Sequence, residues 1–270
     1  MKKRVMSAIV FIALWSIILI VNSPIFDTFV VAAIAMIATY EYFKAFKNIG
    51  YNPISWIGYL GCLGIFLMGG IIPEEYKLLL IKFIVPVGLI SAFSYIIIGN
   101  VRRTVIDVAI TVFGLLYIPV MFSFMKLILN MDYGRFYILY VFCGAFISDT
   151  FAFLVGSKFG KTKLAPDISP NKTVEGSIGG ILGVILSFVV ITIIGNMKLG
   201  INANVFYWIL VGIAASVAGQ FGDLTASAIK RYCKIKDFGN IMPGHGGILD
   251  RFDSLMFVAP IVYLFITIYI

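Results

Sequence analysis

The sequence predicts an all-α polytopic membrane protein of about nine transmembrane helices, with the N-terminus inside and the C-terminus outside. Three observations predict this fold class. Of the 270 residues, 61% are hydrophobic and only 13% are charged, whereas soluble domains have roughly 45–50% and about 25%. Apolar stretches of membrane-spanning length recur along the whole chain. Finally, Lys and Arg are distributed unevenly among the segments that connect these stretches.

The apolar stretches follow one another with short connections. A spanning helix needs about 20 apolar residues, so an apolar window of about 19 residues marks a candidate span. The first stretch follows the basic residues of MKKR, but no small-x-small cleavage site comes after it, so we expect a retained helix rather than a signal peptide. The predicted spans are 5–23, 27–45, 55–72, 78–98, 105–129, 136–157, 175–196, 203–231 and 251–270.

The basic residues orient these spans. With a cytoplasmic N-terminus, 16 of the 21 Lys and Arg residues fall on the cytoplasmic side, which is the bias that the positive-inside rule describes. Only five lie on the other side. They are Lys77, Lys82, Lys126, Arg135 and Lys198. The net charge of +8 is therefore attributed to cytoplasmic loops, and no nucleic-acid partner is expected.

Two cytoplasmic segments, 158–174 and 232–250, are long, basic and rich in Gly and Pro, so we expect the chemistry there. The chain is accordingly divided into N-terminal membrane helices (1–140) and catalytic membrane helices with their loops (141–270), within one integral membrane unit. The three cysteines are widely separated and predict neither a disulfide framework nor a zinc site.

Four acidic residues fall in predicted spans, where a carboxylate is costly unless it faces a polar cavity or a partner. For two of them, Glu41 and Asp107, interfacial pairing with Lys44 or Arg103 is the favoured interpretation. For the other two, Asp149 and Asp223, no Lys or Arg lies within four residues, so a functional role is favoured. All four lie toward the cytoplasmic half of the predicted topology and could line one inward-opening cavity.

The end of the eighth span places unlike polar groups on one face. Asp223, Ser227 and Lys230 have the spacing i, i+4, i+7 of a helix face. Asp250 and Asp253 would likewise share a face at the start of the last helix. The loop between these helices contains Gly246 and Gly247, which permit close approach to a ligand, and the only histidine, His245.

Carboxylates beside ammonium groups and a Gly-rich turn are what a polyphosphate with a divalent cation requires. A structural His245 remains an alternative to a phosphate donor. A second polar cluster begins at Asp149 and continues into the segment 169–175, where Thr173 is expected to cap the following helix, whose N-terminal amides favour an anion. The alternative for this second cluster is an ordinary capped, basic loop.

Residues 227–253, SAIKRYCKIKDFGNIMPGHGGILDRFD, resemble the signature of the phosphatidate cytidylyltransferases, also called CDP-diacylglycerol synthases. The upstream ISPNKTVEG at 168–176 is similar to a second segment of that family. The resemblance extends over about residues 144–260. It implies an enzyme of the bacterial inner membrane, or of its organellar equivalents, with a cytoplasm-facing site that condenses CTP with phosphatidic acid to CDP-diacylglycerol and pyrophosphate and requires Mg²⁺.

The residue patterns and the family resemblance together predict which side chains bind the metal and which bind the substrates. Asp223 and Asp250 are expected as metal ligands, with Asp149 and Asp253 as further candidates. The groups expected to hold phosphates or nucleotide are Lys172, Lys230, Arg231, Lys236, His245, Ser169, Asn171, Thr173, Gly246 and Gly247. The partners are the two substrates and membrane lipids, and a homodimer stays open.

Two alternatives remain at this point. One is a related CTP-dependent enzyme acting on another lipid phosphate or a polyprenol. The other is an ion-coupled transporter, which is disfavoured because the polar features lie on one side and no internal repeat is visible.

Overall fold

The structure is a computed structural model that describes residues 23–70, 104–242 and 246–269, with single positions between 15 and 21 and between 90 and 97. Among the described residues, six helical segments are long and apolar enough to cross a membrane, which supports the predicted all-α membrane class. They are α2 (Pro24–Lys47), the segment Val105–Leu129, α7 (Gly134–Phe159), α8 (Val174–Leu199), α9 (Val205–Tyr232) and α10 (Leu249–Tyr269). The predicted spans 5–23 and 78–98 lie largely outside the described residues, so the count of nine and the orientation stay predictions.

The chain forms two compact units. Unit 1 comprises Met1–Lys126 and Cys233–Asp250, and unit 2 comprises Leu127–Tyr232 and Arg251–Ile270. Each is described by itself below.

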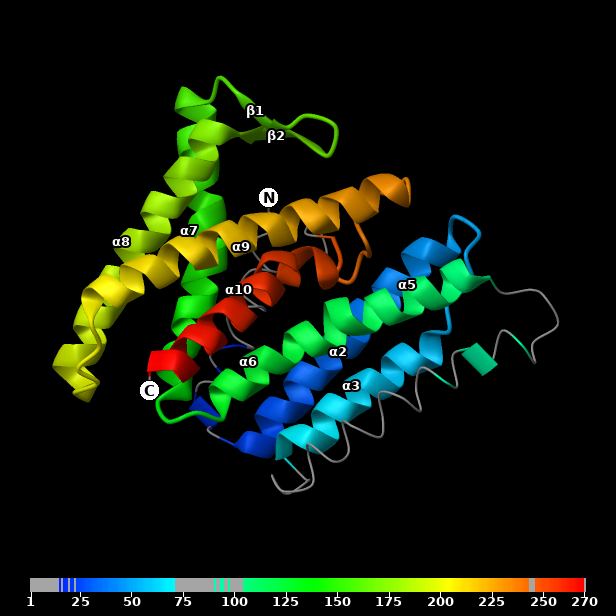
Figure 1. Ribbon diagram of the computed structural model, residues 1–270, viewed down its shortest axis with the longest axis horizontal. Coiled ribbons are helices and arrows are strands. Elements are labelled where there is room, and N and C mark those ends of the chain that lie inside the picture. Colours follow the sequence, from blue (N-terminus) through cyan, green and yellow to red (C-terminus); the bar gives the residue numbers. More distant parts are fainter. Residues whose placement is uncertain are drawn as a thin grey trace. The chain divides into compact units, whose positions relative to one another are not determined.

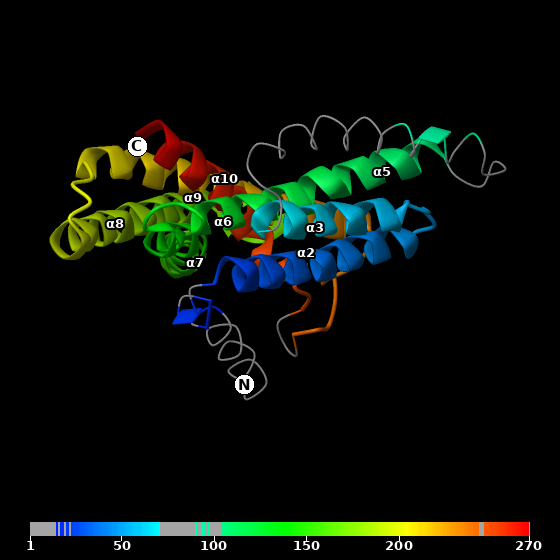
Figure 2. The same cartoon turned by 90° about the horizontal axis from the view of Figure 1, so that it is seen from below.

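In unit 1, helices α2, α3 (Ser55–Gly70) and α5 (Val105–Leu115) lie side by side, as Figures 1 and 2 show. Tyr42 is buried in their core, and its hydroxyl donates to the carbonyl of Ile110 at 3.3 Å. A Cβ on Gly114 would lie 2.6 Å from the Tyr42 ring, so the absence of a side chain there permits the close packing of α5 on α2. The segment continues through a π-helical turn, η1 (Leu116–Val120), at Pro119, and then α6 (Met121–Leu129).

Thr104 caps helix α5, and Asp107 in its first turn completes a capping box. Its carboxylate accepts hydrogen bonds from the backbone N–H groups of Thr104 (2.7 Å) and Asn52 (2.6 Å), and the Thr104 hydroxyl accepts from the Asp107 N–H. A capped helix start therefore satisfies this buried carboxylate. Its predicted partner Arg103 lies outside the described residues.

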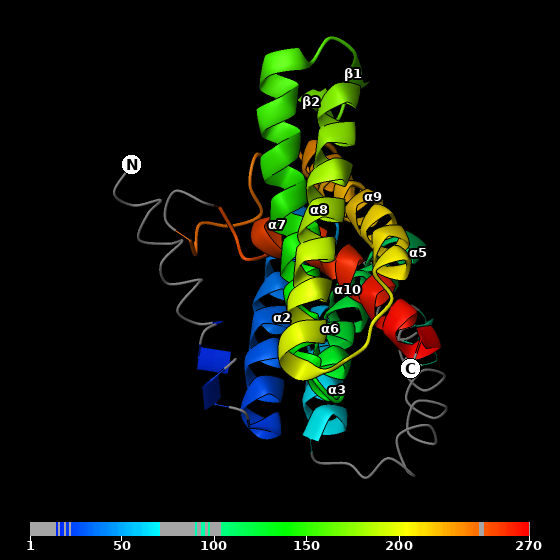
Figure 3. The same ribbon diagram turned by 90° about the vertical axis from the view of Figure 1, so that its left-hand side faces the viewer.

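In unit 2, helices α7 and α8 lie side by side along their lengths (Figure 3). The face of α8 toward α7 carries Gly176, Gly179, Gly180 and Gly183. A Cβ on Gly176 would lie 2.7 Å from the carbonyl oxygen of Ala152. The Gly-rich start of this helix thus serves close helix packing, as small residues do in membrane proteins.

The segment between α7 and α8, expected as a loop, contains a two-stranded antiparallel hairpin of β1 (Lys163–Ala165) and β2 (Ser169–Thr173). Lys163 pairs with Thr173 and Ala165 pairs with Ser169. The strands are short and polar, so they lack the alternating apolar pattern by which a half-buried strand is predicted. The hairpin adds a small β element to the otherwise helical fold.

Candidate active site

The site in unit 2 is built around an ion pair between two distant segments. Lys172 on β2 places its Nζ against the Oδ2 atom of Asp223 on α9. The two side chains are only 24% and 27% exposed, and the ammonium nitrogen itself is buried. A polar hairpin therefore brings a cation to a carboxylate of a membrane-length helix. This explains how Asp223 is accommodated without a basic residue near it in the sequence.

The polar face predicted for α9 is present. Ser227 Oγ donates to Asp223 Oδ1 at 3.5 Å, as the spacing i, i+4 requires. One turn further, Lys230 and Arg231 occupy the last turn of the helix. The Arg231 Nε–H donates to the carbonyl of Ile168 at 3.3 Å, so both ends of the hairpin strand β2 adjoin the polar end of α9.

Two further carboxylates belong to this cluster. Asp253 on α10 is buried, accepts a hydrogen bond from the Ser254 N–H at 2.8 Å, and interacts electrostatically with Asp223, Asp149 and Lys230. Asp149 on α7 interacts with Asp223, Lys172 and Arg251. Helices α7, α9 and α10 therefore each contribute one acidic side chain.

The donor set suits a hard divalent cation, because carboxylate oxygens are the ligands that Mg²⁺ and Ca²⁺ prefer. Asp149, Asp223 and Asp253 supply three such groups within unit 2. In the part of the chain that the structure describes, no group of three acidic, His or Cys side chains is close enough to form a complete metal site. The chemistry of the residues fits a metal, and Lys172 is the cation that Asp223 contacts here.

The hairpin also fixes the start of α8. The Thr173 hydroxyl accepts from the Gly176 N–H at 3.1 Å, which confirms the predicted cap. Glu175 in the first turn accepts from the N–H groups of Lys161 (3.1 Å) and Thr162 (3.2 Å). Ser169 is half-buried and Asn171 is exposed. Their predicted contact with nucleotide stays a prediction.

The site in unit 1 is the loop before α10. Asp250 Oδ2 accepts from the N–H groups of Phe238 (2.8 Å) and Gly247 (2.9 Å). Gly246 has a φ of +84°, a left-handed conformation that favours glycine, and a Cβ there would lie 2.9 Å from the Asp250 carboxylate. Lys236 is exposed. The predicted phosphate donor His245 lies outside the described residues.

Glu41 interacts electrostatically with Lys44, the partner predicted for it, but the hydrogen bonds of this carboxylate go to another segment. Glu41 is 1% exposed, and its carboxylate accepts from the N–H groups of Ile248 (3.1 Å) and Leu249 (2.8 Å). Lys44 places its ammonium 5.8 Å from the centre of the Tyr40 ring. A partner about 200 residues away along the chain could not be recognised from local spacing.

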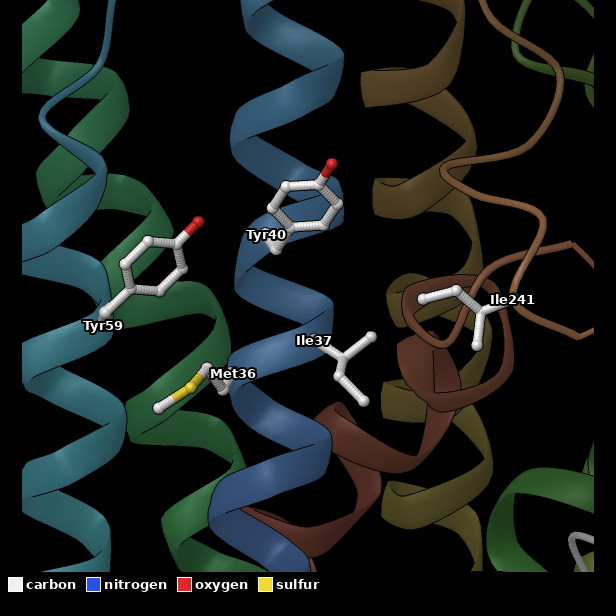
Figure 4. Close-up of a pocket in the computed structure, with 5 residues that line it drawn as sticks. All are labelled: Met36, Ile37, Tyr40, Tyr59 and Ile241. Atoms are coloured by element: carbon white, nitrogen blue, oxygen red, sulfur yellow. The ribbon is translucent and has the colours of Figure 1, made fainter.

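An open apolar groove of about 300 Å³ adjoins the same loop. Figure 4 shows that its side chains come from α2, α3 and the loop. They are Met36, Ile37, Tyr40, Tyr59 and Ile241. Within unit 1, the loop therefore lines this groove through Ile241 and is hydrogen-bonded to α2 through Glu41.

Sequence reasoning missed a polar seam across α7, α8 and α9. The Ser148 and Ser216 hydroxyls are 2.9 Å apart, and Gln220 donates to Ser216 Oγ at 3.3 Å and to the Ser177 carbonyl at 3.2 Å. The seam includes Gln220, three residues before Asp223, and Ser148, next to Asp149. A glutamine inside an apolar span was the signal that could have identified it.

Comparison with known proteins identifies the family. Residues 2–269 match the cytidylyltransferase family. The chain is 32% identical to the phosphatidate cytidylyltransferase of Bacillus subtilis (strain 168) over 275 residues, covering 100% of this chain and 98% of the relative. Phosphatidate cytidylyltransferases of Staphylococcus haemolyticus (strain JCSC1435) and Staphylococcus aureus (strain COL) are 41% and 42% identical over 169 and 171 residues, 63% of each chain. Because the family match extends over nearly the whole sequence, the chain belongs to the cytidylyltransferase family and is a nucleotidyltransferase.

Proposed function

We propose that this protein condenses CTP with phosphatidic acid to form CDP-diacylglycerol and pyrophosphate at the cytoplasmic side of the bacterial inner membrane. The observation that carries the proposal is the Lys172–Asp223 pair, with its neighbouring cations and carboxylates, at the polar end of a membrane-length helix. A lipid phosphate and a nucleoside triphosphate both carry the phosphate oxygens that such cations bind. The names of the relatives supply the substrate class.

The reaction needs charge neutralisation more than proton abstraction. A phosphate monoester has a second pKa near 6, so the lipid phosphate is largely dianionic at neutral pH and needs no strong general base. One of its oxygens attacks the α-phosphorus of CTP, and the bond between that phosphorus and the α–β bridging oxygen breaks, so that this oxygen leaves with pyrophosphate. Lys172, Lys230 and Arg231 are assigned to hold phosphate oxygens, with Lys236 and His245 as further donors.

Mg²⁺ would be held by Asp223 and Asp250, with Asp149 and Asp253 as further ligands. When bound, such a cation neutralises triphosphate oxygens and the charge on departing pyrophosphate. Ser169, Asn171, Thr173, Gly246 and Gly247 are assigned to the nucleotide. Lys172 would exchange its contact with Asp223 for one with substrate phosphate, which would leave the carboxylate for the metal.

The test is a reconstitution assay with purified protein. Pyrophosphate and a CDP-lipid should appear together only when CTP, phosphatidic acid and a divalent cation are all present, since each supplies part of the charge-neutralised transition state. Pyrophosphate release that does not depend on lipid would indicate a nucleotidase.

A parallel reaction with a polyprenol phosphate in place of phosphatidic acid tests the related-enzyme alternative. Faster product formation with the polyprenol would overturn the assignment of phosphatidic acid. Substrate uptake into sealed vesicles without CTP would instead support a transporter.

A further inference from the structure

Glu41 is a buried carboxylate on α2 that accepts two hydrogen bonds from a segment about 200 residues later. Its two oxygens have different partners: Oε1 accepts from the Ile248 N–H at 3.1 Å and Oε2 accepts from the Leu249 N–H at 2.8 Å. Leu249 is the first residue of α10, so these are N–H groups that a helix start leaves without a partner. A residue of another helix satisfies them here.

Two glycines of the loop allow this contact. A Cβ on Gly239 would lie 2.8 Å from the carboxyl carbon of Glu41, and a Cβ on Gly247 would lie 2.6 Å from it. The backbone therefore approaches the carboxylate more closely than any side-chain-bearing residue could. Gly247 also donates to Asp250, so one turn of backbone is hydrogen-bonded to both carboxylates.

Capping α10 through Glu41 buries a carboxylate, whereas a cap from the residue before the helix would not require this. A Ser, Thr or Asp immediately before the helix could have capped α10 without burying a charge. A buried carboxylate is expensive unless hydrogen bonds satisfy it, and here those bonds connect α2 to the turn that presents Gly246, Gly247 and Asp250. Ile241 of the same loop lines an apolar groove together with Ile37 and Tyr40 of α2.

We infer that Glu41 is a positioning residue: it fixes the turn 246–250 against α2 so that Asp250 and the adjacent glycines are held in place for the substrates. The inference rests on the proposed function for its catalytic consequence. Its structural consequence, a turn whose amides depend on Glu41, is independent of what the enzyme acts on.

The experiment compares Glu41→Gln and Glu41→Leu in the full-length protein in detergent. Amide hydrogen exchange of the peptide covering 246–250 should be at least about tenfold faster in Glu41→Leu, because two N–H groups lose their acceptor. Glu41→Gln keeps one acceptor oxygen and should be intermediate. Turnover at saturating CTP and lipid should fall in the same order, and peptides from α7 and α8 should exchange as in the wild type.

Asp27→Asn is the matched control. Asp27 is equally buried on the same helix, 1% exposed, but about 21 Å away at 1.5 Å per residue. It should alter neither exchange of 246–250 nor the turnover.

Unchanged exchange of 246–250 in a folded Glu41→Leu protein would overturn the inference. If Glu41→Leu does not fold, Glu41→Gln decides: exchange of 246–250 and turnover equal to those of the wild type would overturn the inference. If the wild type makes no CDP-lipid, the proposed function fails while the exchange comparison still decides the role of Glu41.

Discussion

At the residue scale, the ion pair between Lys172 and Asp223 joins two distant segments of unit 2. The Lys172–Asp223 pair is mostly buried, and removing one partner leaves the other charge without compensation. Removing both charges separates stability from the proposed catalytic role, because a neutral pair has no charge to compensate, whereas the proposed phosphate binding requires the cation.

We predict that Asp223→Asn lowers the unfolding free energy in detergent by about 1–3 kcal/mol and nearly abolishes turnover. The double variant Lys172→Met/Asp223→Asn should recover most of the stability but none of the turnover. Thermal unfolding and pyrophosphate release measure the two effects. Recovery of turnover in the double variant would show that the pair only supports the fold.

The variant Asp250→Asn tests whether Asp250, the second proposed metal ligand beside Asp223, binds the metal. Asp250→Asn keeps an oxygen that can accept from Phe238 and Gly247 but loses the negative charge, so folding should survive. Turnover should fall by about 100-fold or more, as for other electrostatic groups of an active site. The Mg²⁺ concentration for half-activity should rise. Lys198→Gln, a charge loss at an exposed position, should stay within about twofold.

A normal Mg²⁺ response in Asp250→Asn would contradict the ligand assignment. Loss of detergent stability together with activity would instead identify Asp250 as a structural residue of the loop.

At the scale of elements, the position of the hairpin depends on how closely α8 packs on α7. Gly176 lies where these helices touch, and its N–H is the one that Thr173 caps. A side chain at this position would separate the helices near the residues that carry Lys172.

Gly176→Ala should therefore lower the unfolding temperature clearly, because its Cβ would meet the Ala152 carbonyl at 2.7 Å. Gly212→Ala on α9 is the control, since its Cβ would find only ordinary contacts of 3.4 Å or more. Thermal unfolding of both variants in the same detergent compares them. Equal unfolding temperatures would contradict the packing role of Gly176.

For the whole molecule, the distribution of basic residues predicts which loops share one side of the membrane. Cysteines introduced as Ala165→Cys and Asn240→Cys should be labelled from the cytoplasm by an impermeant reagent. Lys198→Cys should be labelled from outside. The background needs all native thiols replaced, although Cys62 and Cys233 are buried.

Labelling of positions 165 and 240 from opposite sides would contradict a single cytoplasmic site. Labelling of position 198 from the cytoplasm would contradict the odd number of spans.

Features that depend on nearby residues could be predicted before the structure was known. Hydropathy over about 20 residues predicts each span, and α5 to α6, Val105–Leu129, coincides with the predicted stretch 105–129. The α9 face and the Thr173 cap likewise follow from spacings of three or four residues. The two loops proposed to carry the site were likewise selected from their composition.

The partners of the buried charges, in contrast, became visible in the three-dimensional arrangement of the helices. Asp223 is paired with a lysine 51 positions earlier, and Glu41 with amides about 200 positions later. Such contacts depend on how whole helices pack and leave no periodic trace in the sequence. The Gly-rich start of α8 shows the same limit: glycine permits close approach to a phosphate or to another helix, and only the packing on α7 shows which of these occurs.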